Sequence, residues 1–207
     1  LSAVWSTVYS DGLFIASRSG AMLIRLFFDF IYRTTDYYIH SNINIMEFNN
    51  TQVRRQDRLL DETRSFEILK EGEYGILSMR TENGDGAYGI PLSYVWDRGN
   101  SIYIHCAPVG RKLNCIDACT NVSFCVVGRT KVIPGEFTTA YESIVLRCTA
   151  HHGLHEAERM SALSLFLSKY CPNDKIRGLE YAEKSFHRTE IIRLDIEEIS
   201  GKTKNRF

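Results

Sequence analysis

Apolar and polar residues alternate along several short segments of this chain, a pattern typical of β-strands with one buried face. The segments 74–80 and 87–96 flank the polar stretch ENGDG (82–86), whose Asn-Gly and Asp-Gly pairs favour a tight turn. These two segments therefore predict a β-hairpin. Pro91 lies in the second segment and cannot donate a backbone hydrogen bond, so it indicates a bulge, a bend or an unpaired edge.

Four further segments rich in β-branched and aromatic residues predict strands. They cover residues 101–107, 121–130, 141–152 and 189–199. Strands in consecutive hairpins, with few helices between them, favour an α+β class over an alternating parallel sheet. Because closure removes exposed strand edges, we expect a mainly β fold in which six antiparallel strands form a small closed barrel with peripheral helices.

Helical spacing of apolar residues predicts the peripheral helices. They cover residues 54–72, 111–120 and 154–171, with a shorter helix at 178–187. Gly72 follows the last apolar residue of the first helix, as glycine does at many helix C-termini. Pro172 ends the third helix.

Residues 1–45 differ from the rest of the chain in composition. They hold nine of the 24 aromatic residues but six of the 50 charged ones, with no sustained helical or strand period. We expect a non-domain extension, either translated upstream sequence or the product of a mis-set start, with Met46 as the true start of one domain at 46–207. The alternative is an extra docking arm. The apolar stretch 21–32 is too short for a membrane helix of about 20 residues and contains two charges.

Charge and cysteine usage narrow the class of protein. The 25 Lys and Arg residues balance 25 Asp and Glu residues, so no basic excess favours a nucleic acid or an anionic membrane as partner. The six cysteines form no CxxC pair and lie in apolar runs, where reduced cysteine packs as a small hydrophobe. We therefore expect a cytoplasmic protein.

The stretch YIHCAPVGRKL (103–113) carries the clearest chemistry. A strand ends near His105, a turn with Pro and Gly follows, and Arg111 and Lys112 stand where a helix begins. Free amides and the dipole at a helix start attract phosphate, and the two cations would add charge-assisted contacts. The alternative is a solvated helix start without a ligand, and the spacing alone leaves both readings open.

A second constellation, Cys148, His151, His152 and His155, has the residue types of a zinc site. On a strand, however, His151 and His152 point to opposite faces, so we expect no metal site. Cys115 and Cys119 lie one helical turn apart. Packing is the favoured role for this pair, because the sequence shows nothing that would lower a thiol pKa.

The order of several segments resembles a known family. They are RRQDR, YGILSM, YGIPLSYVW, IYIHCAPVGRKL, NVSFCVV, TTAYESIVLRCTA and IIRLDIEEISGK, spanning about residues 53–203. This order resembles the 5-nitroimidazole-resistance (Nim-type) branch of the pyridoxamine 5′-phosphate oxidase-like flavoproteins. The resemblance implies a six-stranded FMN-binding split barrel that forms a homodimer with flavin at the subunit interface.

The same resemblance implies a set of site residues. Arg111 and Lys112 correspond to the phosphate-binding cations, and His105 to a histidine beside the cofactor that is also the candidate catalytic proton donor. The implied contacts to the flavin ring are Pro91, Leu92, Ser93, Tyr94, Cys106 and Ala107, followed by Tyr141, Glu142 and Ser143. We expect FMN as the cofactor, with FAD as an alternative.

The function that the resemblance implies is a flavin-dependent oxidoreductase that reduces small aromatic compounds such as 5-nitroimidazoles. One alternative is a flavin-binding or sensing module without turnover, because one fold hosts many functions. Another is an oxidase of the pyridoxamine 5′-phosphate type. It is less favoured because the longer basic C-terminal signature of that enzyme has no match in EEISGKTKNRF.

Overall fold

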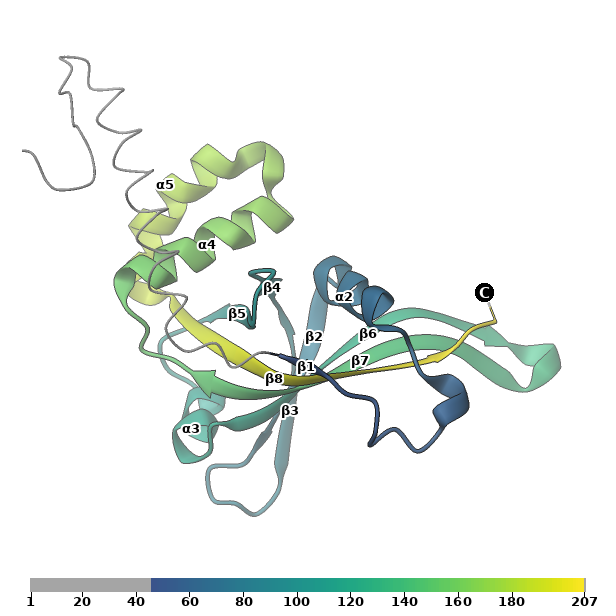
Figure 1. Cartoon of the computed structure of the whole chain (residues 1–207). Helices are drawn as coiled ribbons and strands as arrows, with labels where there is room; N and C mark the ends of the chain where they lie inside the picture. Colours follow the sequence, from purple (N-terminus) through teal and green to yellow (C-terminus); the bar gives the residue numbers. More distant parts are fainter. Residues whose placement is uncertain (1–45, 207) are drawn as a thin grey trace, which may run out of the picture. The chain divides into compact units, whose positions relative to one another are not determined.

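The computed structural model describes residues 46–206, so the interpretations of residues 1–45 and of the apolar stretch 21–32 lie outside the described part of the chain. All described residues belong to one compact unit. A large sheet forms its centre, and helices lie at its periphery (Figure 1). Within residues 46–206, no helix is long and apolar enough to cross a membrane.

The strands are β1 (Glu47–Phe48), β2 (Tyr74–Arg80), β3 (Ala87–Ser93), β4 (Val95–Trp96), β5 (Ser101–Cys106), β6 (Asn121–Ile133), β7 (Thr138–His151) and β8 (Glu190–Lys204). The helices are α2 (Glu62–Glu71), α3 (Arg111–Ala118), α4 (Glu156–Tyr170) and α5 (Lys175–Ser185). Every predicted strand and helix therefore has a counterpart, although the helix predicted from residue 54 begins only at Glu62 and the strand predicted at 87–96 is divided.

The prediction of a mainly β, antiparallel fold with peripheral helices is confirmed, but the strand count and the closure were wrong. The sheet has eight strands in the order β3-β2-β6-β7-β8-β5-β4, and β1 pairs with β8 in parallel. The predicted strand 87–96 is two strands, because the chain leaves β2 at Tyr94 and pairs with β5 from Val95 onward. The sheet is not closed at this point, although its two end strands, β3 and β4, are consecutive in the chain.

The hydrophobic core lies on one face of the sheet, where every second residue of the long strands is buried. In β2 exposed and buried positions alternate without a break, as the period of two predicts. Buried members of this face include Leu77, Phe124, Ile144, Leu146 and Leu194. Helix α2 adds Ile68 and Leu69 to the same core.

Helix α2 begins later than predicted. The residues before it pair with β8, since the Leu60 amide donates to the Gly201 carbonyl at 3.1 Å. Asp61 then caps the helix, and its carboxylate accepts a hydrogen bond from the Arg64 amide at 2.9 Å. The predicted helix 54–72 is therefore shortened by a tertiary contact that the local pattern does not contain.

Gly72 ends α2 as predicted, but for a different reason. Its φ of −57° is not left-handed, so the backbone conformation does not require glycine. A Cβ atom at this position would lie 2.6 Å from Val126 Cγ1 and 2.7 Å from the Tyr94 hydroxyl. Close approach of α2 to the sheet therefore requires glycine here.

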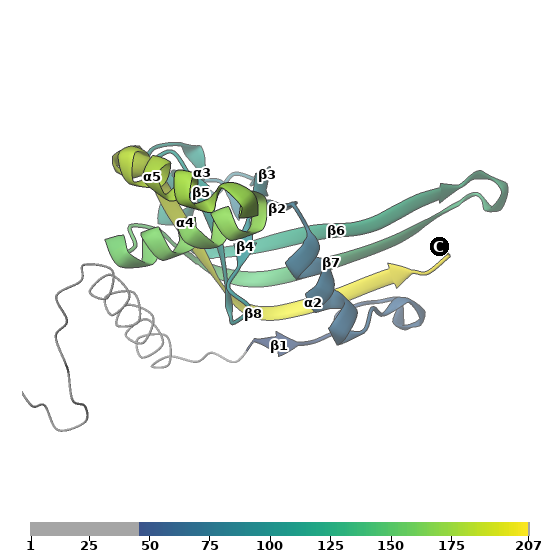
Figure 2. The same ribbon diagram turned by 90° about the horizontal axis from the view of Figure 1, so that it is seen from above.

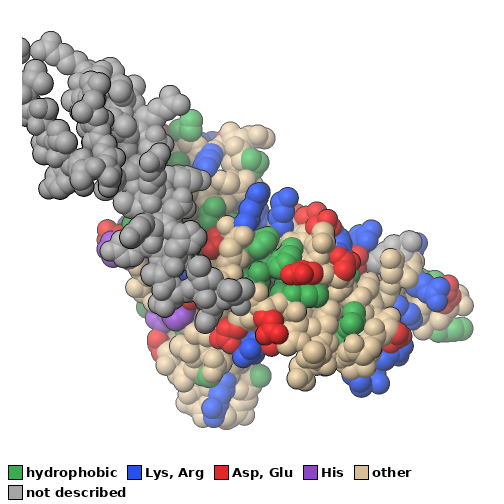
Figure 3. Space-filling model, viewed as in Figure 1, with side chains coloured by type: hydrophobic (Ala, Val, Ile, Leu, Met, Phe, Trp, Pro, Cys, Tyr) green, Lys and Arg blue, Asp and Glu red, His purple; other side chains and the backbone are tan. Residues whose placement is uncertain are grey.

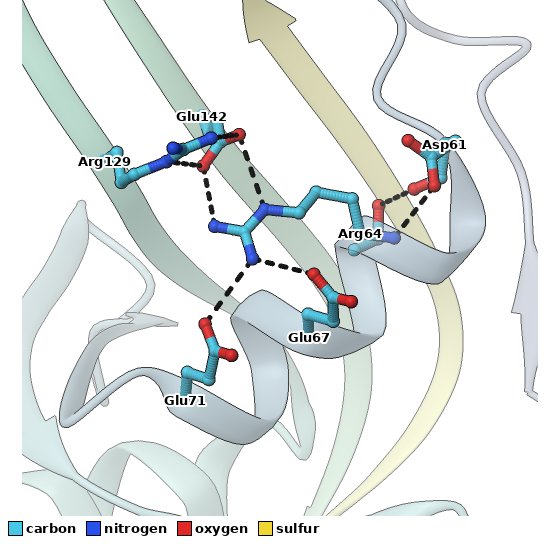
Figure 4. Close-up of polar contacts among 7 residues, drawn as sticks. Asp61, Arg64, Glu67, Glu71, Arg129 and Glu142 are labelled. Atoms are coloured by element: carbon cyan, nitrogen blue, oxygen red, sulfur yellow. Dashed lines mark hydrogen bonds and ion pairs between the residues drawn. The ribbon is translucent and has the colours of Figure 1, made fainter. Parts of the chain in front are cut away.

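Helix α2 is also tied to the sheet by charged side chains (Figure 4). Glu142 on β7 is almost fully buried, and its carboxylate lies 2.9 Å from Arg64 on α2 and 2.9 Å from Arg129 on β6. Arg64 also pairs with Glu67 and Glu71 along its own helix. The hydrogen bonds from Arg129 and from Arg64 hold the pKa of Glu142 down, at about 2.

The first prediction concerns this ion pair. Because the pKa of Glu142 falls from 4.5 to about 2 on folding, its stabilising effect is present above pH 4.5 and is lost as the pH falls towards 2. Glu142→Gln should lower the free energy of unfolding at neutral pH by about 3 kcal/mol, since it leaves Arg64 without its buried partner. Urea unfolding across the acid range measures both effects.

Glu136→Gln is the matched control, because Glu136 is exposed in the turn between β6 and β7. It should leave stability unchanged. If Glu142→Gln keeps the acid dependence of the parent protein, the ion pair does not cause it.

Strands β6 and β7 continue beyond the body of the sheet as a long hairpin, and the end of β8 pairs near its base (Figure 2). A register shift between Val127 and Thr130 marks where the hairpin leaves the body. Phe137 at the tip is 97% exposed. On the face shown in Figure 3, Lys and Arg side chains lie among Asp and Glu side chains at this end of the domain.

Candidate functional site

The break between β3 and β4 leaves the backbone of Tyr94 without a strand partner, and helix α4 supplies one. The Tyr94 amide donates to the Tyr170 hydroxyl at 3.2 Å, and that hydroxyl lies 2.8 Å from the Tyr94 carbonyl. The Tyr170 hydroxyl also lies 2.5 Å from the Glu73 carbonyl, so the two carbonyls share its single proton. The Tyr94 side chain is fully buried, and its own hydroxyl donates to the Leu69 carbonyl at 2.6 Å.

Lys169 completes this support. Its ammonium donates to the Gly72 carbonyl at 2.6 Å and to the Tyr94 carbonyl at 3.0 Å, and it lies 4.1 Å from the centre of the Tyr94 ring. Burial lowers the pKa of Lys169 to about 8. The C-terminal end of α4 therefore binds both the end of α2 and the strand break.

The same helix reaches the end of β5. His105 packs edge-to-face against Phe166, with ring centres 4.8 Å apart, and Phe166 stacks on Tyr170 at 5.9 Å. Helix α4 thus carries an aromatic row from the end of β5 to the strand break. Packing against Phe166 partly shields the His105 imidazole from water, and this desolvation lowers its pKa and favours the neutral form.

The start of α3 lies near the β3 edge. Gly110 precedes the helix with a φ of +149°, no side chain caps the helix, and a Cβ atom at Gly110 would meet nothing within 4 Å. The Arg111 guanidinium lies 4.9 Å from the centre of the Tyr88 ring on β3, and its Nε is 3.5 Å from the Glu82 carboxylate. The free amides of this uncapped helix start and the two cations are donors that an anion needs, and the space beside Gly110 is open.

The structure places nine of the twelve predicted site residues along β3, at the break, at the end of β5 and at the start of α3. Pro91, Leu92 and Ser93 lie on β3, which is an end strand of the sheet, so the expectation of an edge at Pro91 is confirmed. His105 is the penultimate residue of β5 and contacts Phe166 of α4, and Ser93 ends β3 next to the break. The exposed members of the set are Pro91, Ser93, His105, Ala107 and Arg111, while Leu92, Cys106 and Lys112 are partly buried. Their contact with a cofactor stays a prediction.

Three of the predicted site residues lie on a strand that is not next to β3. Tyr141, Glu142 and Ser143 are on β7, which β2 and β6 separate from β3. The Glu142 carboxylate is directed at Arg64 and Arg129. Within a single chain, these three residues therefore lie apart from the other predicted site residues.

Residues that the sequence reasoning missed contact Arg111, His105 or Tyr94. They are Glu82, Tyr88, Phe166, Lys169 and Tyr170. The spacing of four between Phe166 and Tyr170 in the predicted helix 154–171 places the two rings on one helix face. No local pattern marks Glu82 or Lys169, because their partners are distant in sequence.

The residues of the zinc and thiol alternatives have separate partners. Cys148 is buried, His151 pairs with Asp195 at 3.3 Å, and His152 pairs with Asp117 at 2.7 Å. Within residues 46–206, no three His, Cys, Asp or Glu side chains gather as metal ligands. Cys115 donates to Glu82 at 3.3 Å, whereas Cys119 lies 3.9 Å from the Asn121 carbonyl.

Sequence comparison assigns this fold to a family. The profile of the family described as pyridoxamine 5′-phosphate oxidase matches residues 61–203. The chain belongs to the pyridoxamine 5′-phosphate oxidase family. No functionally curated protein matches the chain.

Solved structures of similar fold support the same architecture. A candidate 5-nitroimidazole antibiotic resistance protein from Bacteroides thetaiotaomicron has a TM-score of 0.60 at 16% identity, covering 70% of this chain and 86% of its own. The flavocytochrome Anf3 from Azotobacter vinelandii has a TM-score of 0.60 at 19% identity, covering 78% and 76%. An FAD-binding protein from Mesorhizobium loti has a TM-score of 0.53 at 20% identity, covering 72% and 98%. These likenesses show the fold.

The second prediction tests the support of the strand break in this family member. Tyr170→Phe removes the hydroxyl that serves the Tyr94 amide, so the free energy of unfolding should fall by about 1–3 kcal/mol. Hydrogen exchange at the Tyr94 amide should also accelerate. Tyr181→Phe is the matched control, because Tyr181 is 65% exposed on α5. Equal stability of the two variants would contradict the role assigned to Tyr170.

Proposed function

We propose that this protein binds a flavin beside the free edge of β3 and the end of β5 and reduces small aromatic compounds of the 5-nitroimidazole type. FMN is the proposed cofactor and FAD the alternative. A bound flavin supplies the redox chemistry, because it accepts and donates electrons singly or in pairs. The observation that carries the proposal is the pair of cations at the open start of α3, beside the free edge of β3.

The side chains at this helix start fit a phosphate group. Within residues 46–206, Arg111 makes a polar contact only through Nε, so both terminal amino groups remain to donate. Lys112 adds a second cation next to Cys106 at the end of β5. A guanidinium fork binds phosphate through two parallel hydrogen bonds, and a lysine adds a point charge.

The proposed roles of the other residues follow from where they lie. Pro91, Leu92 and Ser93 would offer backbone groups of a strand edge to the polar rim of the flavin ring. His105 is the proposed catalytic residue, and its neutral imidazole can hold or pass a proton beside a bound substrate. The solved structures of similar fold include an FAD-binding protein, a flavocytochrome and a candidate nitroimidazole resistance protein, which supports a flavin at this fold.

We also propose a cytoplasmic homodimer with the flavin at its interface. Five of the proposed contact residues are exposed, whereas a bound cofactor buries about 70–90% of its surface, so a second surface has to cover it. An apolar row of adjacent residues, Pro91, Ile76, Cys125 and Val145, crosses the outer face of four strands. Such a row favours a protein interface. All six cysteines are free thiols, as a reducing compartment favours.

The direct experiment identifies the flavin in the purified protein by its absorbance spectrum and by mass after release. Reduction by NADPH or NADH under anaerobic conditions, followed by reoxidation on addition of a 5-nitroimidazole, would support the reductase. A flavin that binds but is not reoxidised would support the binding or sensing module instead. Turnover of pyridoxamine 5′-phosphate with oxygen would support the oxidase.

The third prediction tests the phosphate site. Charge-assisted hydrogen bonds contribute about 1.5–3 kcal/mol each, so Arg111→Ala should weaken FMN binding by about tenfold to a hundredfold. Lys112→Ala should weaken it less, because water replaces a point charge more easily than a fork. Flavin fluorescence titration of the apo-protein measures the affinity.

Riboflavin, which lacks the phosphate, is the ligand control, and its affinity should stay unchanged in both variants. Arg188→Ala is the matched protein control, since Arg188 is exposed after α5. Loss of riboflavin affinity equal to that of FMN would show that α3 does not bind the phosphate.

The fourth prediction tests the homodimer. Ile76→Glu places a charge in the apolar row, where Ile76 is 38% exposed. It should raise the dimer dissociation constant at least about tenfold and weaken flavin binding with it. Ile176→Glu on α5 is the control, because Ile176 is 80% exposed away from the row. A monomer that binds stoichiometric flavin in sedimentation would overturn the interface.

A further inference from the structure

The turn between β2 and β3 is stabilised by backbone and side-chain hydrogen bonds within it. The Thr81 amide donates to the Gly86 carbonyl at 3.0 Å, and the Gly84 amide donates to the Thr81 carbonyl at 2.9 Å. The buried Thr81 hydroxyl donates to the Asp85 carboxylate at 2.6 Å. Gly84 has a φ of +72°, which glycine adopts without strain. Asp85 is therefore used within the turn, and Glu82 is the carboxylate that reaches out of it.

Glu82 reaches the first turns of α3. Its Oε2 atom accepts from the Cys115 thiol at 3.3 Å and from Arg111 Nε at 3.5 Å. Arg111 and Cys115 are four residues apart and lie on the same face of α3. Because Cys115 is fully buried, its contact fixes the carboxylate oxygen that Arg111 meets.

Two residues of one hairpin thus define the place of the Arg111 side chain. Glu82 at the turn contacts Nε, and the Tyr88 ring on β3 lies 4.9 Å from the guanidinium carbon. These contacts leave both terminal amino groups without a protein partner among the described residues. An arginine held through Nε and its face presents its remaining fork in a fixed direction, so less side-chain entropy is lost when an anion binds.

We propose that Glu82 is a positioning residue, which holds Arg111 in the orientation that binds the phosphate of the flavin. This inference rests on the proposed function, since it names a residue that supports the same site. Glu82 acts through Arg111 and does not touch the cofactor. The direction of the change in FMN affinity identifies this role. A carboxylate that acted only by its charge would repel phosphate, so its removal would strengthen FMN binding. Loss of a positioning residue weakens FMN binding instead.

The test is FMN titration of the apo-protein by flavin fluorescence, with a thermal melt for each variant. Glu82→Ala should weaken FMN binding by about threefold to tenfold and leave riboflavin unchanged, because one charge-assisted contact loses its orientation. Glu82→Gln keeps an oxygen that accepts from Nε, so its affinity should lie between those of Glu82→Ala and the parent protein. Asp117→Asn removes a carboxylate from α3, the helix of Arg111, and should leave FMN affinity unchanged, since Asp117 pairs with His152.

Double variants separate positioning from a general structural effect. In an Arg111→Ala background, Glu82→Ala should cause no further loss of FMN affinity, because the group through which Glu82 acts is absent. FMN binding by Glu82→Ala at or above the parent affinity would overturn the inference, as would an additive loss in the double variant. If Glu82→Ala does not fold, Glu82→Gln decides by the same criteria.

The two proposals fail in different ways. If Arg111→Ala weakens FMN binding but both Glu82 variants bind like the parent protein, the phosphate site stands and the positioning role is wrong. If Arg111→Ala leaves FMN affinity unchanged, the phosphate site itself is wrong and the role of Glu82 falls with it.

Discussion

The structure depends on how the chain satisfies its backbone at Tyr94, where one strand stops pairing with β2 and the next begins to pair with β5. A buried amide or carbonyl without a partner costs about 1–3 kcal/mol, so such a break needs donors and acceptors from outside the sheet. Tyr170 and Lys169 provide them from α4. The Tyr94 hydroxyl returns a hydrogen bond to α2, and the two helices are thereby joined at one point of the sheet.

The candidate site lies where it does because the sheet is open there. An unclosed ladder leaves strand β3 with a free edge, and the end of β5 and the start of α3 lie nearby. Open edges are liabilities unless something covers them. In this protein a ligand and a second protomer would provide that cover, so the proposed cofactor site and the proposed interface answer the same physical need.

Membership of the pyridoxamine 5′-phosphate oxidase family leaves the reaction open, because the similar folds belong to proteins with different descriptions. What separates their chemistry has to lie in side chains around the candidate site. In this chain those side chains are a neutral histidine, two cations at a helix start and an aromatic row on α4. The ion pairs of Glu142 serve a separate purpose, since they hold α2 against β6 and β7 (Figure 4).

The sequence by itself determined most of the strands and helices and singled out Arg111 and Lys112 as candidate phosphate ligands, because alternation, turn residues and a helix start after Gly110 are local properties. Only the tertiary structure decided that the strand 87–96 divides at Tyr94, that α2 starts at Glu62 and that Glu142 faces two arginines. It also decided that Glu82 meets Arg111 and that α4 supports the break. Each of these features joins residues far apart in the chain, and local periodicity carries no information about which distant partner a backbone group or a charge will find.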